Sequence, residues 1–180
     1  STLQQTTIYR KFLQDFLKVY SIRSVVDAGC GDWTFSRHMD WSGVKYTGVD
    51  VVQSVIHKNR LAFATPSVRF IHADFLSKDL PTADLLICKD VLQHLPNDKI
   101  THFIKQFGKY KYCLITNGVD TQTQSSTNSD IHLGDYRPLD LTRPPFLVTG
   151  VKILSYEGNN SNGEHWMKQV LLICNAKCKK

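Results

Sequence analysis

Two glycines and an aspartate lie where a short apolar run near the start of the chain ends. The stretch reads Val25-Val26-Asp27-Ala28-Gly29-Cys30-Gly31-Asp32-Trp33, and Asp50 follows Gly29 by 21 residues, at the end of a second apolar run. Glycines at such a turn let backbone N–H groups come close to a ligand. A short carboxylate at the end of the second run can accept hydrogen bonds from the two hydroxyls of a ribose. The spacing therefore predicts a nucleoside site.

The turn differs from the dinucleotide-binding fingerprint, because Thr34 stands where the third glycine belongs. This difference argues against a pyrophosphate ligand. The pattern Asp27-x-Gly29-x-Gly31 with Asp50 instead resembles the nucleoside site of class I S-adenosylmethionine-dependent methyltransferases. S-adenosylmethionine is therefore the cofactor that the resemblance implies.

The resemblance also implies a role for each residue near the site. Asp50 would hold the ribose, Asp74 would bind the adenine amino group, and Phe75 would pack on the adenine ring. Asp27 would anchor the turn and approach the amino group of the ligand. The other residues implied in cofactor binding are Gly29, Cys30, Gly31, Asp32, Trp33, Val51 and Lys89. Two simpler roles stay open, a helix cap for Asp50 and a turn-forming aspartate for Asp74.

A second group of polar residues follows the apolar run that ends at Cys88. In the family that this chain resembles, methyl transfer takes place near this point, which implies that Lys89, Asp90 and His94 lie close to it. A hydroxyl acceptor needs a base to remove its proton, and Asp90 and His94 are the candidates. The histidine could instead order the loop. The sequence Arg143-Pro144-Pro145-Phe146 only superficially resembles the motif of nucleic-acid amino-methyltransferases, because it follows the wrong strand.

A divalent cation is an alternative way to activate a hydroxyl. Asp90, Asn117 and Asp120 follow adjacent predicted strands and offer hard oxygen ligands suited to Mg²⁺. Two carboxylates and one amide at loop positions make a magnesium site one possibility beside the metal-free reaction.

Three motifs together extend the resemblance over nearly the whole chain. They are Gly29-Cys30-Gly31-Asp32-Trp33, residues 89–95, and Asp135-Tyr136-Arg137-Pro138-Leu139-Asp140-Leu141 with Pro144-Pro145-Phe146. They resemble small methyltransferases associated with glycan assembly, including domains fused to glycosyltransferases in bacteria and large DNA viruses. This resemblance implies an O-methyltransferase that acts on a hydroxyl of a sugar or glycan. Asp135, Tyr136 and Arg137 would then bind the acceptor.

Two other functions compete with this interpretation. The formal net charge is +6, which permits binding to nucleic acid, so an RNA-directed methyltransferase is one alternative. Half of that charge comes from Lys177, Lys179 and Lys180, and no arginine-rich run is interleaved with aromatics, so a nucleic-acid partner is disfavoured. The other alternative is a catalytically silent module that binds the cofactor and serves as an interaction domain.

The elements that must position these residues alternate along most of the chain. An amphipathic helix is expected over residues 3–20, with Ile8, Phe12, Phe16 and Tyr20 four apart and Leu13 and Leu17 beside them. Further helices are expected over residues 33–39, 52–61 and 97–107. Strands are expected over residues 24–28, 44–49, 68–72, 84–88, 110–116, 146–156 and 166–175. Alternation predicts an α/β fold with a parallel sheet, and the last two runs predict an antiparallel hairpin. The family resemblance implies a Rossmann-like, seven-stranded sheet of this kind with helices on both faces.

Size and composition indicate one globular domain over residues 1–180. Because the sequence starts at Ser1 with no initiator methionine, we expect a processed product or a domain excised from a longer polypeptide. Hydrophobic content of 42% and charged content of 21% are ordinary for such a domain. No run is apolar enough to insert into a membrane, and the five cysteines suit reduced, buried thiols in a cytoplasmic protein, of a bacterium or of a host cell if viral. The long polar stretch 117–145 is expected to contribute to the acceptor site.

Overall fold

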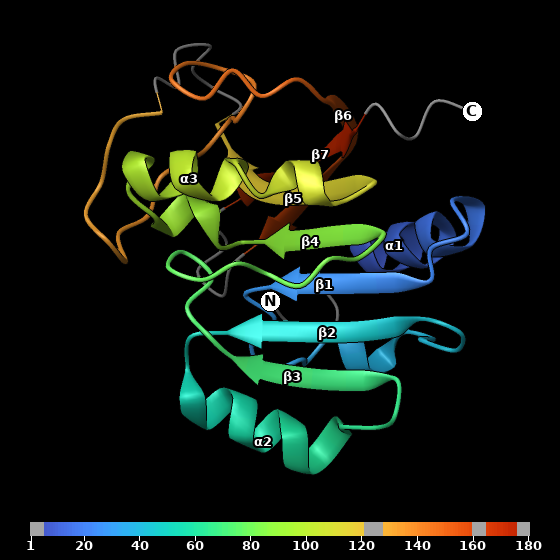
Figure 1. Ribbon diagram of the computed structural model, residues 1–180. Helices are drawn as coiled ribbons and strands as arrows, with labels where there is room; N and C mark the ends of the chain where they lie inside the picture. Colours follow the sequence, from blue (N-terminus) through green and yellow to red (C-terminus); the bar gives the residue numbers. More distant parts are fainter. Residues whose placement is uncertain (1–5, 121–127, 160–164, 176–180) are drawn as a thin grey trace. The chain divides into compact units, whose positions relative to one another are not determined.

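The computed structural model describes residues 6–120, 128–159 and 165–175, which form a seven-stranded sheet with helices around it (Figure 1). The strand order is β3-β2-β1-β4-β5-β7-β6. Strand β1 pairs in parallel with β2 and β4, and β2 pairs in parallel with β3. Strand β7 runs antiparallel to β5 and to β6. The prediction of a Rossmann-like, mostly parallel sheet with a C-terminal antiparallel hairpin is confirmed.

The chain divides after Ile87 into two compact units. The elements of the first unit, in chain order, are α1 (Thr7–Val19), β1 (Ser24–Ala28), the 3₁₀ helix η1 (Ser36–His38), β2 (Lys45–Asp50), α2 (Gln53–Phe63), β3 (Val68–His72) and β4 (Leu85–Lys89), whose end continues into the second. The second unit then contains η2 (Leu92–His94), α3 (Asn97–Ile104), η3 (Phe107–Lys109), β5 (Tyr112–Val119), β6 (Val151–Asn159) and β7 (His165–Cys174).

Helix α1 forms where the sequence predicts a helix, but it buries a different face. Tyr9, Leu13, Phe16 and Leu17 are buried, whereas Ile8 is 55% exposed. The predicted face, spaced four apart from Ile8, is therefore offset by about one residue from the buried one. Both faces fit a helical period, because aromatic and aliphatic residues cover more than one stripe of this helix.

The helix predicted over residues 33–39 is wrong in extent, because only η1 forms there. Trp33 has a left-handed backbone with φ of +59°. The Asp32 carboxylate accepts a hydrogen bond from the Thr34 N–H at 3.1 Å, which closes a turn in place of a helical one. The crossover from β1 to β2 therefore consists mainly of loop.

In the second unit, the stretch between β5 and β6 lacks regular structure in its described part, residues 128–150. Buried side chains nevertheless hold it in place. Leu139 and Leu141 are buried, and the buried Asn128 side chain donates to the carbonyls of Asp140 and Pro144 at 2.8 and 2.9 Å. Strand β6 begins at Val151, later than predicted, because residues 140–148 are folded into turns instead.

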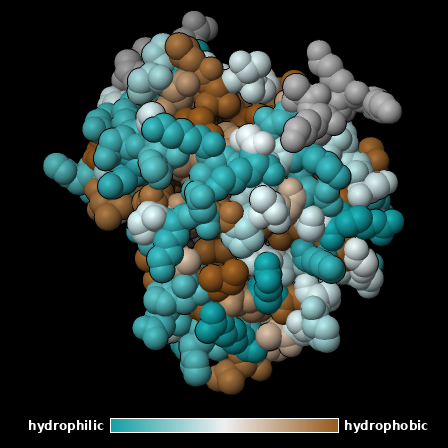
Figure 2. All heavy atoms as spheres, in the orientation of Figure 1, coloured by the Kyte–Doolittle hydropathy of each residue, from teal (hydrophilic) through white to brown (hydrophobic). Residues whose placement is uncertain are grey.

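Hydrophilic residues cover much of the face seen in Figure 2, with apolar residues between them. No helix within the described ranges is both long and apolar enough to cross a bilayer. The thiols of Cys30, Cys88 and Cys113 are buried as predicted, whereas Cys174 is exposed at the end of β7. Cys178 lies outside the described residues.

Candidate functional site

The glycine turn after β1 has the backbone that its sequence requires. Gly29 and Gly31 have φ of +81° and +55°, a backbone conformation that residues other than glycine rarely adopt. The N–H groups of Gly29 and Cys30 both donate to the Val49 carbonyl, so β2 holds the turn. A Cβ added to Gly31 would meet no atom of the described chain within 4 Å, so the space beside the turn is open. This open, glycine-lined turn suits close approach of a ligand.

Asp50 joins this turn to helix α2. One carboxylate oxygen accepts from the Gly31 N–H at 3.0 Å, and the other accepts from the Val52 N–H at 2.9 Å. The bond to Val52 closes a turn just before α2, which has no side-chain cap, so the helix-cap role of Asp50 is wrong. A carboxylate offers about four acceptor positions, so two remain for the hydroxyls of a ribose. Next to it, the Val51 side chain is 59% exposed, which leaves it available to a ligand.

Asp27 and Cys30 are buried below the turn. The Tyr46 hydroxyl donates to the Asp27 carboxylate at 2.6 Å, and burial together with that charge raises the pKa of Tyr46. A Cβ on Gly48 would lie 2.8 Å from the Cys30 sulfur, so the thiol packs where only glycine fits. Burial, reinforced by Asp27 and Asp50, raises the pKa of Cys30 well above its usual range. The thiol therefore stays protonated and is no nucleophile.

The structure places Trp33 away from its predicted position as a cofactor contact. Its ring is 6% exposed and packs against Tyr46, Phe63 and Phe70, with centroids 5.1–5.5 Å away. The left-handed backbone at Trp33 turns the indole into this aromatic cluster. The Asp32 side chain, which accepts from Thr34, is exposed and stays next to the turn.

Asp74 and Phe75 follow β3 directly. The Asp74 side chain accepts from the Leu76 N–H at 2.9 Å, so the turn-forming role is real. The residue is exposed, and its carboxylate keeps acceptor positions for an amino group. Phe75 is 6% exposed, so little of its ring is open to an adenine. The adenine-binding roles of both residues stay predictions.

Changing Asp50 to Asn should weaken binding of S-adenosylmethionine and S-adenosylhomocysteine by about 1–3 kcal/mol, the scale of hydrogen bonds to a charged group. Asn keeps the shape and one acceptor oxygen for the turn, so the fold should survive. Asp50→Ala should weaken binding at least as much. Calorimetric titration measures the effect, with Asp15→Asn on the exposed face of α1 as the control. Unchanged affinity in both Asp50 variants would remove this residue from the ribose role.

The second unit contains a charged cluster around Asp90, which follows β4 with φ of +61°. Its carboxylate forms ion pairs with Lys89 and with Lys168 of β7, whose side chains are 6% and 9% exposed. Burial alone would raise the pKa of Asp90, but the attraction of the two ammonium groups outweighs burial and lowers it. Burial lowers the pKa of Lys168, and Asp90 opposes that change. Lys89 is thus engaged with Asp90 rather than placed as a free cofactor contact.

Sequence reasoning missed Gln93 and Lys168 in this cluster. The Gln93 side-chain oxygen accepts from the Gly118 N–H at 2.7 Å and from the Lys168 ammonium at 3.2 Å. A Cβ on Gly118 would lie 2.6 Å from the Tyr136 hydroxyl, so only glycine admits that hydroxyl. The one available signal was a lysine inside the apolar run of β7, which is unusual for a buried strand.

His94 lies at the edge of the same cluster. Its Nδ1 is 3.0 Å from the Asp135 carbonyl oxygen, and its Nε2 is 3.3 Å from the Gln93 amide nitrogen. A carbonyl can only accept, so this network assigns the proton to Nδ1 and leaves the lone pair on Nε2. The Tyr136 ring packs 5.7 Å from the imidazole, centroid to centroid. The structure therefore places His94, Asp135 and Tyr136 beside the Asp90 cluster, and their roles in methyl transfer and acceptor binding stay predictions.

Arg137 does not have the position expected of an acceptor-binding residue. It is 6% exposed, and its guanidinium donates to the Leu95 carbonyl at 3.0 Å and to the Asn97 side chain at 2.7 Å. These bonds hold the 128–150 stretch against the start of α3. The assignment to the acceptor is corrected to a structural role, because the cationic group points into the protein.

Replacing Arg137 with Met should lower the free energy of unfolding by about 2–3 kcal/mol, since two hydrogen bonds from a charged group are lost inside the protein. Methionine retains much of the packing of the aliphatic stem. Urea unfolding gives the value. Tyr136→Phe is the control, because Tyr136 is 54% exposed, and its stability should change by less than about 0.5 kcal/mol. Equal stability of the two variants would contradict the structural role.

The structure does not bring the predicted magnesium ligands together. Asn117 and Gly118 are neighbours in β5, so their side-chain positions point to opposite faces. The Gly118 position faces Gln93 and Lys168 of the Asp90 cluster, whereas Asn117 lines a small cavity with Leu139 and Leu141. Asp120 is exposed beyond the end of β5. Among the described residues, no group of three histidine, cysteine or acidic side chains is arranged to hold a metal.

Comparisons with known proteins agree with the fold and with the position of the glycine turn. Residues 25–110 match the protein family described as "Methyltransferase domain". An uncharacterized methyltransferase of Mycobacterium bovis is 27% identical over 94 residues, which cover 51% of this chain. The match spans 48% of that relative, so the chain covers about half the length of the curated relative it matches.

Two solved structures have a similar fold at low sequence identity. Magnesium protoporphyrin IX methyltransferase from Synechocystis, with bound S-adenosylhomocysteine, has a TM-score of 0.64 at 13% sequence identity. The superposition covers 93% of this chain and 82% of the Synechocystis chain. The N-methyltransferase NodS from Bradyrhizobium japonicum has a TM-score of 0.62 at 11% identity, with 94% and 98% covered. Together the comparisons support the predicted class, a class I S-adenosylmethionine-dependent methyltransferase, and the predicted cofactor.

Proposed function

We propose that this protein transfers a methyl group from S-adenosylmethionine to a hydroxyl of a sugar or glycan. The observation that carries the cofactor half of the proposal is the open glycine turn tied to Asp50, whose carboxylate keeps acceptor positions. Gly29, Gly31 and Asp50 would hold the nucleoside part, and Asp74 would bind the adenine amino group. The cofactor supplies an electrophilic methyl group when bound. The protein's own residues must orient the acceptor and remove its proton.

The polar cluster of the second unit supports a hydroxyl acceptor. His94, Gln93, Asp135 and the Tyr136 hydroxyl offer hydrogen-bonding groups of the kind that sugar hydroxyls use. Burial, with the charge of Asp90, raises the pKa of Tyr136, so its hydroxyl stays a donor around neutral pH. The acceptor role of Asp135 and Tyr136 is retained in the proposal, and Arg137 is left out of it.

Between the two candidate bases, the contacts favour His94 over Asp90. The Asp90 carboxylate is paired with two ammonium groups that lower its pKa, and a carboxylate with a lowered pKa is a weak base. The Asp135 carbonyl fixes the proton on Nδ1, so the lone pair lies on Nε2, where it accepts from the Gln93 amide at 3.3 Å until an acceptor hydroxyl takes that place. Asp90 then acts as a positioning residue for Lys89 and Lys168. Magnesium dependence is not included in the proposal, because the predicted ligands do not converge.

The test of this proposal is transfer from methyl-labelled S-adenosylmethionine to a panel of glycans, RNAs and small phenols. Labelled glycan, lost in a His94→Ala variant that still binds the cofactor, is the expected result. Label in RNA with strong salt dependence would support the RNA-directed alternative instead. Cofactor binding without transfer to any member of the panel would favour the silent interaction module. Screening acceptors of an attached glycosyltransferase domain, where the full polypeptide has one, extends the panel.

A further inference from the structure

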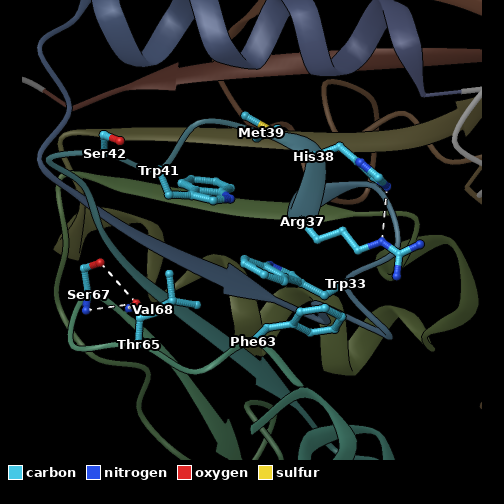
Figure 3. A pocket seen from close by; sticks show the side chains of 10 residues that line it. All are labelled: Trp33, Arg37, His38, Met39, Trp41, Ser42, Phe63, Thr65, Ser67 and Val68. Carbon is cyan, nitrogen blue, oxygen red and sulfur yellow. Dashed lines mark hydrogen bonds between the residues drawn. The ribbon is translucent and has the colours of Figure 1, made fainter. Parts of the chain in front are cut away.

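A pocket of about 500 Å³ opens in the first unit, apart from the glycine turn (Figure 3). Its walls are aromatic and apolar, and its rim is polar. The lining residues are Trp33, Arg37, His38, Met39, Trp41, Ser42, Phe63, Thr65, Ser67 and Val68. The volume falls within the range of about 300–1,000 Å³ that small-molecule sites occupy.

This pocket lies at the other end of the strands from the predicted nucleoside site. Trp41 and Ser42 come just before β2, and Ser67 precedes β3, so the pocket adjoins the amino ends of these strands. Asp50 closes the carboxyl end of β2, five residues beyond Lys45. At about 3.3 Å per residue, the two ends of β2 are roughly 16 Å apart. A ligand in this pocket would therefore leave the glycine turn free.

Three rings give the pocket its chemistry. Figure 3 shows the rings of Trp33 and Phe63 close together, with Trp41 on the side of Met39. The indole N–H of Trp41 donates to the Ser36 carbonyl at 2.8 Å. Its polar edge is thereby satisfied. Trp33 and Trp41 are 6% and 8% exposed, so each presents only an edge of its ring to the pocket, and Phe63 is the most exposed of the three. Rings of this kind bind flat apolar groups by stacking and edge contacts.

The rim adds a charge to this aromatic surface. Arg37 is exposed, and Figure 3 shows it beside His38, with Thr65 and Ser67 across the rings. The Arg37 Nε donates to the His38 Nε2 at 3.1 Å, so that imidazole nitrogen is an acceptor and the positive charge of the pair lies on the guanidinium. No acidic side chain is among the lining residues. Asp40 borders the rim, where its carboxylate accepts from the Ser42 N–H at 2.9 Å. An aromatic wall whose lining carries a guanidinium and no carboxylate fits an anion better than a cation.

We propose that this pocket is a second ligand site, which binds a small planar organic anion: a flat apolar ring system that carries a carboxylate, sulfonate or phosphate. The ring would pack against Phe63 and the exposed edges of Trp33 and Trp41, and the anionic group would meet Arg37. The site is independent of the methyl-transfer proposal, because its residues and ligand are different.

The test uses 8-anilinonaphthalene-1-sulfonate as the probe and its uncharged analogue N-phenyl-1-naphthylamine for comparison. The sulfonate should bind the folded protein at one site and quench tryptophan fluorescence, because two of the three tryptophans line the pocket. Saturating S-adenosylhomocysteine should leave its dissociation constant unchanged within about twofold. Competition by S-adenosylhomocysteine, or binding without saturation, would overturn the proposal.

Two matched pairs of variants locate the site. Arg37→Ala should weaken the sulfonate about threefold to tenfold and the neutral analogue less than about twofold, because an exposed charge pair contributes modestly. Arg23→Ala, an exposed arginine that does not line the pocket, should change neither. Phe63→Ala should weaken both probes about tenfold through lost ring contacts. Leu61 is 77% exposed on the same helix, and Leu61→Ala should leave the affinity for both probes unchanged.

Circular dichroism in the near ultraviolet confirms that each variant is folded. Equal effects of Arg37→Ala and Arg23→Ala would show that net charge, not this site, holds the anion. Equal effects of Phe63→Ala and Leu61→Ala would place the probe elsewhere. Concentration-dependent dimerisation of the parent that Phe63→Ala abolishes, seen by sedimentation velocity, would assign the pocket to a second copy of the chain and overturn the small-ligand proposal.

Discussion

Replacing His94 with Ala should lower methyl transfer by about 10²–10⁴-fold, the contribution of a positioned base to a proton transfer. Cofactor affinity should change little, because the residues expected to hold the nucleoside belong to the glycine turn and Asp50. The expected loss rests on one contact. The Asp135 carbonyl fixes the proton on Nδ1 at 3.0 Å, which leaves Nε2 as the basic nitrogen. Single-turnover kinetics with labelled cofactor measure the effect.

A second histidine variant shows whether the loss is specific to His94. His102→Ala is the matched control, since His102 is an exposed histidine of α3 outside the cluster. A folded His94→Ala that turns over at the parental rate would remove His94 as the base.

The parallel half of the sheet was predictable because its strands are short apolar runs bounded by turn residues. Strands β1 and β3 have the predicted bounds, and β2 and β4 begin and end within one residue of them. Strand β6 was predicted five residues too early, because the apolar stretch Pro145-Phe146-Leu147 folds into turns. The N–H groups of Phe146 and Leu147 donate to the Arg143 carbonyl, and the Asn128 side chain donates to the Pro144 carbonyl. The periodicity of a short segment does not reveal such partners.

The backbone part of the site was also predictable, since glycine spacing and a strand-end carboxylate follow from local sequence. The positions that long side chains take in the fold could not be predicted in this way. Trp33 turns into the core because its backbone is left-handed, and Arg137 turns inward to the Leu95 carbonyl. Lys168 reaches Asp90 across 78 positions of sequence, through the pairing of β5 with β7. Contacts of this range depend on strand register, which a single sequence does not specify.

Replacing Asp90 with Asn should lower the free energy of unfolding by about 3 kcal/mol, near the lower end of the cost of breaking a buried ion pair. Two ammonium groups with 6% and 9% exposed side chains lose the carboxylate between them. Lys168 still donates to the Gln93 side-chain oxygen, which limits the loss. Asn is nearly isosteric and tolerates the left-handed backbone at this position, so the variant tests charge rather than shape.

The dependence of this loss on pH separates the ion pairs from packing. The pKa of Asp90 is lower in the folded protein than in the unfolded chain, so its stabilisation is fully present above the unfolded value, about 3.9. This stabilisation disappears as the pH falls through the pKa of Asp90 in the folded protein. Urea unfolding should therefore show the full difference between parent and Asp90→Asn near pH 7 and a shrinking one below about pH 4. Asp98→Asn, an exposed acid of α3, should cost less than about 0.5 kcal/mol at either pH. A difference for Asp90→Asn that stays constant with pH would mean that shape, not charge, holds the cluster together.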